Sequence, residues 1–109
     1  MSESVKKKVL ICDDDDLLRE FYSRVLKNQG LSPVTAANGD EAIEVLAKNK
    51  DGIGLAIIDL LMPVRSGWEL IGFIKNSEEL KHIPVIAVTG LSTSWSTAAH
   101  VALTFSNSS

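Results

Sequence analysis

Two apolar runs of this chain end in carboxylates. Asp13 and Asp14 follow the run KVLIC at 8–12, and Asp59 closes the run GLAIID at 54–59. Carboxylates held close together repel one another, and burying them is costly unless a cation balances their charge. Mg²⁺ is a suitable cation because proteins typically hold it with a few carboxylates and water. If the fold brings these acids together, the sequence predicts a magnesium site.

A third apolar run, IPVIAVTG at 83–90, contains Thr89, which would add a hydroxyl to the same rim. Each of these residues also has a simpler interpretation. Asp13 and Asp14 could cap a helix, Asp59 could merely end a strand, and threonine is common at strand ends. Capping explains one acid but not two acids together with Asp59, so the metal-site interpretation is favoured.

Strands and helices must alternate to position these residues. Short apolar, β-branched runs predict strands, and apolar residues at helical spacing predict helices. The first helix has this spacing from Leu17 to Leu26, with Asp15 or Asp16 as its cap and Gly30 as its stop. The other predictions are strands at 8–12, 32–37, 54–59 and 83–90 and helices at 38–50 and 66–77. The inner face of the helix at 38–50 is predicted to carry Ala42, Ile43, Leu46 and Ala47.

This alternation predicts an α/β fold, in which a parallel sheet is covered by helices on both faces. In such a three-layer sandwich with the flavodoxin-like strand order 2-1-3-4-5, ligands bind at the carboxyl ends of strands one and three. That order would bring Asp13, Asp14 and Asp59 to one crevice, although Asp59 lies 45 residues after Asp14.

Composition excludes several function classes. The 109 residues are expected to form one domain, 1–109, with a net charge of −3. The only basic cluster, KKK at 6–8, is interpreted as a solvated strand entrance, so nucleic acid is not an expected partner. No signal peptide or bilayer-spanning stretch is recognised, so no membrane is expected. A single cysteine, Cys12, fits a reducing cytoplasm. His82 and His100 lack partners at metal-binding spacing and are assigned to no site.

Three motifs carry a resemblance to a known family. They are VLICDDDDLLRE with its acid pair, IIDLLMPVRSGWEL with Asp59, a Met-Pro pair and Gly67, and IPVIAVTG with Thr89. Thr89 lies 30 residues after Asp59, a usual spacing for that family. In this order the motifs resemble the response-regulator receiver domains of two-component signalling, over about residues 8–90.

The resemblance implies a role for each acid. Asp59 would be the nucleophile that takes a phosphoryl group from a phosphohistidine. Asp14 would hold Mg²⁺ directly and Asp13 mainly through water, while Asp59 and the backbone carbonyl of Leu61 would complete the protein ligands. Phosphoryl transfer depends on positioning and on neutralising oxygen charge, which agrees with such a pocket.

On the same resemblance, the hydroxyl of Thr89 and the backbone N–H of Gly90 would contact the phosphoryl oxygens. The phosphoryl donor would be a sensor histidine kinase or a phosphotransfer protein. The chain would be a phosphoacceptor rather than an enzyme, because its chemistry would act only on itself. With no output domain recognised, any output would be through protein contact.

Residues 91–109 depart from the receiver pattern. Receivers carry a lysine at the end of a fifth strand and then a fifth helix, but only 20 residues follow Thr89 and none is lysine. No charged residue follows Lys81, and only a short helix near 94–103 is suggested. The fifth strand and fifth helix are therefore expected to be missing or altered in this atypical segment. An altered reading frame, an engineered end and natural divergence remain open as its origin.

Two consequences are expected from that departure. Without the lysine, coupling of phosphorylation to a surface change should be impaired. The apolar strand at 84–88 and part of the first helix should be uncovered, and exposed apolar edges favour pairing. A homodimer, or an oligomer formed by element exchange, is predicted.

Three functions are compatible with these features. The leading one is a phosphoacceptor module of a two-component phosphorelay. The second is a receiver-like interaction or dimerisation module that no longer signals by phosphate, which the missing lysine favours. The third is an Mg²⁺-dependent phosphohydrolase with an aspartate nucleophile. It ranks last because such enzymes typically need a second acid two residues after the nucleophile, where this chain has Leu61.

Overall fold

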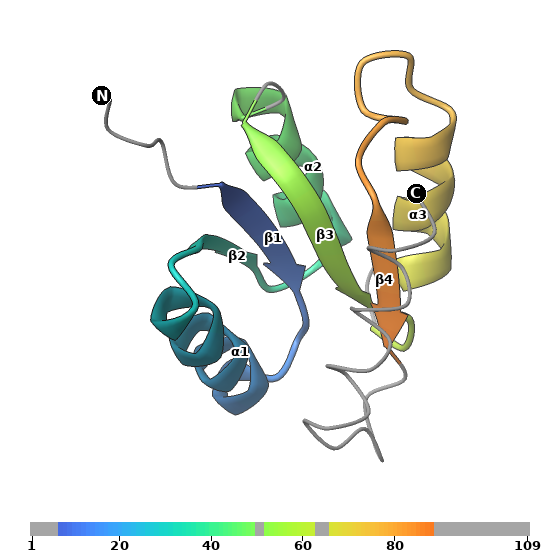
Figure 1. The fold of residues 1–109 in the computed structure, drawn as a ribbon. Coiled ribbons are helices and arrows are strands. Elements are labelled where there is room, and N and C mark those ends of the chain that lie inside the picture. The colour runs from blue at the N-terminus through green and yellow to red at the C-terminus, as the bar shows by residue number, and fades with distance from the viewer. Residues whose placement is uncertain (1–6, 50–51, 63–65, 89–109) are drawn as a thin grey trace, which may run out of the picture.

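The computed structural model describes residues 7–49, 52–62 and 66–88, which form a sheet with helices on both sides (Figure 1). The strands are β1 (Lys8–Cys12), β2 (Ser32–Ala36), β3 (Ile53–Asp59) and β4 (Val85–Val88). The helices that connect them are α1 (Asp16–Asn28), α2 (Gly39–Lys48) and α3 (Gly67–Lys75). None of the described helices combines the length and the apolar character that a bilayer-spanning helix needs.

The described strands are parallel and lie in the order β2-β1-β3-β4, which confirms the predicted flavodoxin-like order for these four. The register pairs Cys12 of β1 with Ile58 of β3, so Asp13 and Asp59 follow at the same edge of the sheet. On its other side, β3 pairs Asp59 with Val88 of β4. The atypical C-terminal segment, with its expected lack of a fifth strand and helix, lies outside the described residues.

Alternate strand residues face two helical layers, with α1 on one side of the sheet and α2 and α3 on the other (Figure 1). The core on the α1 side comprises Val9, Ile11, Tyr22, Leu26, Ile57, Ile86 and Val88. The core on the other side includes Leu10, Cys12, Ala42, Leu46, Ile58, Leu70 and Ile74. Because helices cover both faces of the sheet, β1, β3 and β4 are almost continuously apolar, whereas the edge strand β2 (SPVTA) is mostly half-buried.

Capping side chains determine where the helices begin. Asp15 caps α1, Asn38 caps α2 and Ser66 caps α3, each accepting hydrogen bonds from backbone N–H groups of the first turn. The predicted helices at 38–50 and 66–77 therefore start one residue early, because their caps lie outside the helix, and they end two residues late.

One predicted face differs from the observed one. In α2, Ala42 and Leu46 are buried as predicted and Ile43 is half-buried, but Ala47 is exposed. The prediction for Ala47 is wrong because each helical residue is turned about 100° from the one before it. That rotation carries Ala47 away from the stripe formed by Ala42 and Leu46.

Candidate metal centre

The carboxyl ends of β1 and β3 bring three acidic residues together. Asp13 and Asp14 directly follow β1, and Asp59 is the last residue of β3. Each residue offers one carboxylate oxygen, and these three atoms all lie within 4.8 Å of one another. The three acids converge, as predicted, because β1 and β3 are neighbours in the sheet although a helix, a strand and a second helix separate them in the chain.

Two of these acids are buried and the third is exposed. Asp13 is 2% exposed and Asp59 is 3% exposed, whereas Asp14 faces solvent. Burial, with the charges of Asp59 and Asp14, raises the pKa of Asp13 to about 6, although the N–H of Asp15 acts in the opposite direction. Buried like charges of this kind need a balancing cation or a retained proton.

Asp13 has hydrogen bonds at three of its four polar atoms. Its N–H donates to the carbonyl of Ala36 at 3.1 Å, and its Oδ1 accepts from the N–H of Asp15 at 2.9 Å. Its carbonyl accepts from Nη1 of Arg19 at 2.7 Å. The fourth atom, Oδ2, is buried with no hydrogen-bond partner in the described part of the chain. An orphaned carboxylate oxygen beside two further carboxylates is a donor set that fits Mg²⁺.

Asp59 is held in a similar turn. Its Oδ1 accepts from the N–H of Leu61 at 3.0 Å, and the N–H of Leu60 donates to the carbonyl of Val88 at 2.9 Å. These two bonds tie the end of β3 to itself and to β4. Leu61 thus lies beside the acid cluster, and its carbonyl as a cation ligand stays a prediction.

Gly67, the first residue of α3, packs against the backbone of Asp59. A Cβ atom at this position would overlap the carbonyl oxygen of Asp59 and lie 2.7 Å from Cα of Leu60. The N–H of Gly67 also donates to the carbonyl of Leu60 at 3.3 Å. The sequence places Gly67 in a motif but does not reveal this contact, because a loop gives no periodic signal.

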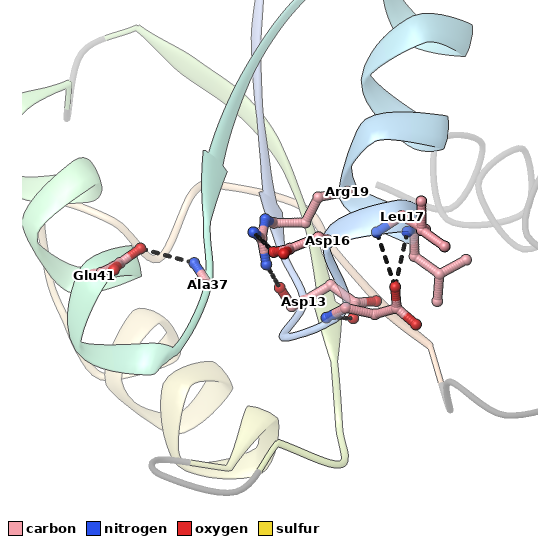
Figure 2. A network of polar contacts seen from close by, with 8 residues as sticks. Asp13, Asp16, Leu17, Arg19, Ala37 and Glu41 are labelled. Atoms are coloured by element: carbon pink, nitrogen blue, oxygen red, sulfur yellow. Dashed lines mark hydrogen bonds and ion pairs between the residues drawn. The ribbon is translucent and has the colours of Figure 1, made fainter.

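The position of Arg19 was also not predicted from the sequence. Its guanidinium extends from α1 back to the loop after β1, where it binds the carbonyl of Asp13 and pairs with Asp16 (Figure 2). The available signal was an acid and a base three residues apart on one helix, a spacing that permits an ion pair. Spacing alone gave no indication of the contact with Asp13.

Cys12 is the buried last residue of β1 and immediately precedes the acid pair. Burial, and then the charges of Asp13 and Asp59, raises the pKa of its thiol to about 12. Its Sγ donates to the carbonyl of Asn38 at 3.4 Å and lies 3.6 Å from Sδ of Met62. The side chain therefore acts as a small core residue that keeps its proton.

Two predicted site residues lie outside the described residues. They are Thr89 and Gly90, which directly follow the last residue of β4, Val88. Their predicted contacts with phosphoryl oxygens stay predictions.

Comparisons with known sequences identify similar proteins. The family model described as "Response regulator receiver domain" matches residues 9–105. The polar-differentiation response regulator DivK of Brucella anthropi is 32% identical over 83 residues, which cover 76% of this chain and 66% of that relative. The 3',5'-cyclic-nucleotide phosphodiesterase regA of Dictyostelium discoideum is 32% identical over 85 residues, which cover 78% of this chain and 11% of that relative. The chain thus spans about two thirds of DivK and a small part of regA.

Solved structures with the same fold include several response regulators. CheY4 of Vibrio cholerae aligns with a TM-score of 0.74 and 26% identity, covering 93% of this chain and 81% of its own. A receiver protein from Pseudomonas putida aligns with a TM-score of 0.71 and 30% identity, covering 94% and 82%. TrrA of Thermotoga maritima, solved in complex with Mg(2+)-BeF, aligns with a TM-score of 0.70 and 29% identity, covering 87% and 80%.

Proposed function

This chain belongs to the family of response-regulator receiver domains, and from that premise we propose that it accepts a phosphoryl group on Asp59 in a magnesium-dependent reaction. The observation that carries the proposal is the cluster of Asp13, Asp14 and Asp59, whose oxygens lie within 4.8 Å of one another. Three carboxylates at this spacing repel one another and destabilise the fold. A bound cation would offset that repulsion, so the cluster favours a cation-binding role. The complex of TrrA with Mg(2+)-BeF supports magnesium as that cation.

Asp59 supplies the nucleophile. A carboxylate oxygen of Asp59 forms a bond to phosphorus while the P–N bond of a phosphohistidine breaks, and the electron pair of that bond returns to the imidazole nitrogen. The hydrogen bond from the N–H of Leu61 to Oδ1 orients the carboxylate for this attack. Bound Mg²⁺ supplies charge neutralisation for the phosphoryl oxygens, which would otherwise repel the carboxylate.

The remaining site residues take the roles that the resemblance implies. Asp14 binds the cation directly, because its exposed carboxylate is open to a hydrated ion. Asp13 acts mainly through water, and the carbonyl of Leu61 is a further ligand. The hydroxyl of Thr89 and the N–H of Gly90 contact the phosphoryl oxygens.

The donor in this proposal is a phosphohistidine on a sensor histidine kinase or a phosphotransfer protein, and the reaction takes place in the cytoplasm. The chain transfers phosphate only to itself and is not an enzyme toward other substrates. The name of DivK, a response regulator, supports a regulatory role. The phosphodiesterase activity in the name of regA is not transferred, because this chain covers 11% of that protein.

The test is intact-protein mass spectrometry after incubation with Mg²⁺ and a small-molecule acyl phosphate. We expect a single phosphoryl adduct that requires Mg²⁺ and is absent from Asp59→Asn. Asp40→Asn, which removes a carboxylate from the first turn of α2, is the matched control and should retain the adduct. A folded, Mg²⁺-binding sample that forms no adduct would overturn the proposal.

A second candidate function is an interaction module that works without phosphate, and an apolar surface on α1 favours it. Leu17 is 76% exposed and Phe21, one turn later, is 44% exposed. Together with Glu20 and Arg24 they line a shallow groove. We propose a second copy of this chain as the occupant, directly or by element exchange. An antiparallel copy would bring opposite charges together around the paired apolar side chains.

Light scattering with size-exclusion chromatography tests this second candidate. We expect a dimer for the unaltered chain and a monomer for the double variant Leu17→Ser and Phe21→Ser. Phe73→Ser is the control, because Phe73 is 43% exposed but lies on α3, away from the groove. A monomeric unaltered chain at working concentration would exclude self-association.

A further inference from the structure

One guanidinium spans the loop that presents the acid pair. Nη1 of Arg19 donates to the carbonyl of Asp13 at 2.7 Å, and Nη2 pairs with Oδ1 of Asp16 (Figure 2). The side chain of Arg19 is 19% exposed, whereas that of Asp16 is 86% exposed. The contact with Asp13 is therefore the more enclosed of the two, and it joins helix α1 to the end of strand β1.

The contact with Arg19 completes a set of bonds that leaves one atom of Asp13 unused. The N–H of Asp13 is bound to Ala36, its Oδ1 to the N–H of Asp15 and its carbonyl to Arg19. Oδ2 alone is buried with no hydrogen-bond partner among the residues described. Three fixed atoms determine the orientation of a residue, so they also determine where Oδ2 lies relative to Asp14 and Asp59.

The guanidinium binds the carbonyl of Asp13 and not its carboxylate. A guanidinium on the carboxylate would neutralise the acid and compete with a cation for the same oxygens. At the carbonyl, Arg19 fixes the backbone and leaves Oδ2 available. This placement separates the positioning of the acid from the binding of a cation.

We propose that Arg19 is a positioning residue of the acid pocket, which holds Asp13 at the spacing that a small cation requires and thereby sets a preference for Mg²⁺ over Ca²⁺. The inference rests on the proposed function, since it requires that the pocket binds Mg²⁺. Mg²⁺ demands near-octahedral geometry and keeps several of its waters, through which Asp13 acts, whereas Ca²⁺ accepts flexible geometry. A loosened loop therefore penalises Mg²⁺ more than Ca²⁺.

The experiment is isothermal titration calorimetry. The unaltered chain and Arg19→Ala are each titrated with Mg²⁺ and, separately, with Ca²⁺. We expect Arg19→Ala to raise the Kd for Mg²⁺ about tenfold, the lower end of the effect of removing a residue that orients a metal ligand. The Kd for Ca²⁺ should rise less, so the ratio of the two constants falls. Arg19→Lys retains one donor for the carbonyl of Asp13 and should recover part of the Mg²⁺ affinity. It also carries the test if Arg19→Ala does not fold.

Two control variants isolate the contact with Asp13. Lys27→Ala removes an exposed cation from the last turn of the same helix and should leave both constants unchanged. Asp16→Asn removes the exposed ion pair but keeps the contact with the carbonyl, and should change the Mg²⁺ constant less than Arg19→Ala does. Thermal melts of each variant separate loss of cation affinity from loss of stability.

Several outcomes would overturn the inference. If Arg19→Ala binds both cations more tightly, the positive charge of Arg19 repels them and its positioning of Asp13 has no effect on binding. If both cations weaken equally, or if only the melting temperature falls, Arg19 merely stabilises the helix. An adduct on Asp59 with unchanged cation selectivity in Arg19→Ala would overturn this inference and leave the proposed function standing. Lowered selectivity in Arg19→Ala, with no adduct on the unaltered chain, would support this inference and overturn the proposed function. Absence of Mg²⁺ binding by the unaltered chain would overturn both.

Discussion

The loop after β1 and the loop after β3 hold their acids with the same local turn but support it in different ways. In each loop, Oδ1 of the aspartate accepts from the N–H two residues later, at 2.9 Å for Asp13 and 3.0 Å for Asp59. Arg19 then fixes the first loop by a hydrogen bond and an ion pair. The second is fixed by Gly67, whose Cα lies against the carbonyl of Asp59.

The difference indicates which conditions each loop tolerates. Polar contacts in the loop after β1 respond to pH, to cations and to substitution of a distant charge. The loop after β3, which is held by steric contact, should be sensitive mainly to substitutions that add side-chain volume at Gly67. The pocket therefore has a steric wall, the loop after β3 that carries the nucleophile, and a polar wall, the loop after β1 that carries the acid pair.

Adding a methyl group to the steric wall should have the largest effect. Gly67→Ala would place Cβ against Asp59 and Leu60, and backbone cannot move as freely as a side chain. We expect a loss of about 2 kcal/mol in the free energy of unfolding. Displacement of the nucleophile should lower the rate of adduct formation about a hundredfold. Urea unfolding and timed mass spectrometry measure the two effects, and a variant with normal stability and rate would show that the contact is unimportant.

Removing the buried charge from the polar wall should have a smaller effect with the opposite sign. The pKa of Asp13 is about 6 in the folded chain against a usual value of 3.8, so the folded chain holds this proton more tightly than the unfolded chain. Its contribution to stability is therefore complete below pH 3.8 and is lost as the pH rises through about 6. Asp13→Asn should stabilise the cation-free protein at pH 7 by about 1 kcal/mol, after allowance for solvent screening.

Urea unfolding in a chelator at pH 5 and pH 7 measures this contribution of Asp13. Asp40→Asn makes the same change of charge at an exposed position in α2 and should leave the pH dependence of the unaltered chain in place. With saturating Mg²⁺ the unaltered chain should become the more stable of the two, because only it binds the ion tightly. An Asp13→Asn protein that is less stable than the unaltered chain at pH 7 without cation would contradict the expectation.

Gly72→Ala should have the smallest effect and serves as the control for Gly67→Ala. Gly72 lies in the same helix, α3, and an added Cβ there meets nothing within 4 Å. Replacing this half-buried helical glycine by alanine should stabilise the chain by about 0.5 kcal/mol, because the added methyl group has open space. Loss of stability in this variant would indicate that α3 tolerates no added methyl group, and the effect at Gly67 would then lose its specific meaning.

The fold could be predicted because its strands and helices leave strong periodic signals. Apolar runs ending at Cys12 and Asp59 predicted buried strands, their alternation with helices predicted a parallel sheet, and the flavodoxin-like architecture supplied the strand order. The ends of the helices were less predictable, because Asn38 and Ser66 have the same local character whether they cap a helix or begin it. Hydrogen bonds to backbone N–H groups, which the sequence does not display, decide between the two.

The acid cluster could be predicted for a related reason, since strand order alone brings Asp13 and Asp59 together. The supports of the pocket could not, because they depend on distances between elements. Gly67 contacts Asp59 only through the path of a loop, and Arg19 contacts Asp13 only because helix α1 turns back over the end of β1. The roles of Thr89 and Gly90, and of the carbonyl of Leu61, stay predictions.

Cys12 is a natural chemical probe of local unfolding around the acid pocket. It is the only thiol in the chain, it is 1% exposed, and it keeps its proton at neutral pH because its pKa is about 12. An alkylating reagent reacts with exposed thiolate, so it can modify Cys12 only when β1 separates from its neighbours. The rate of alkylation therefore reports how often β1 opens beneath the acid pocket. A cation bound in the pocket should lower that rate.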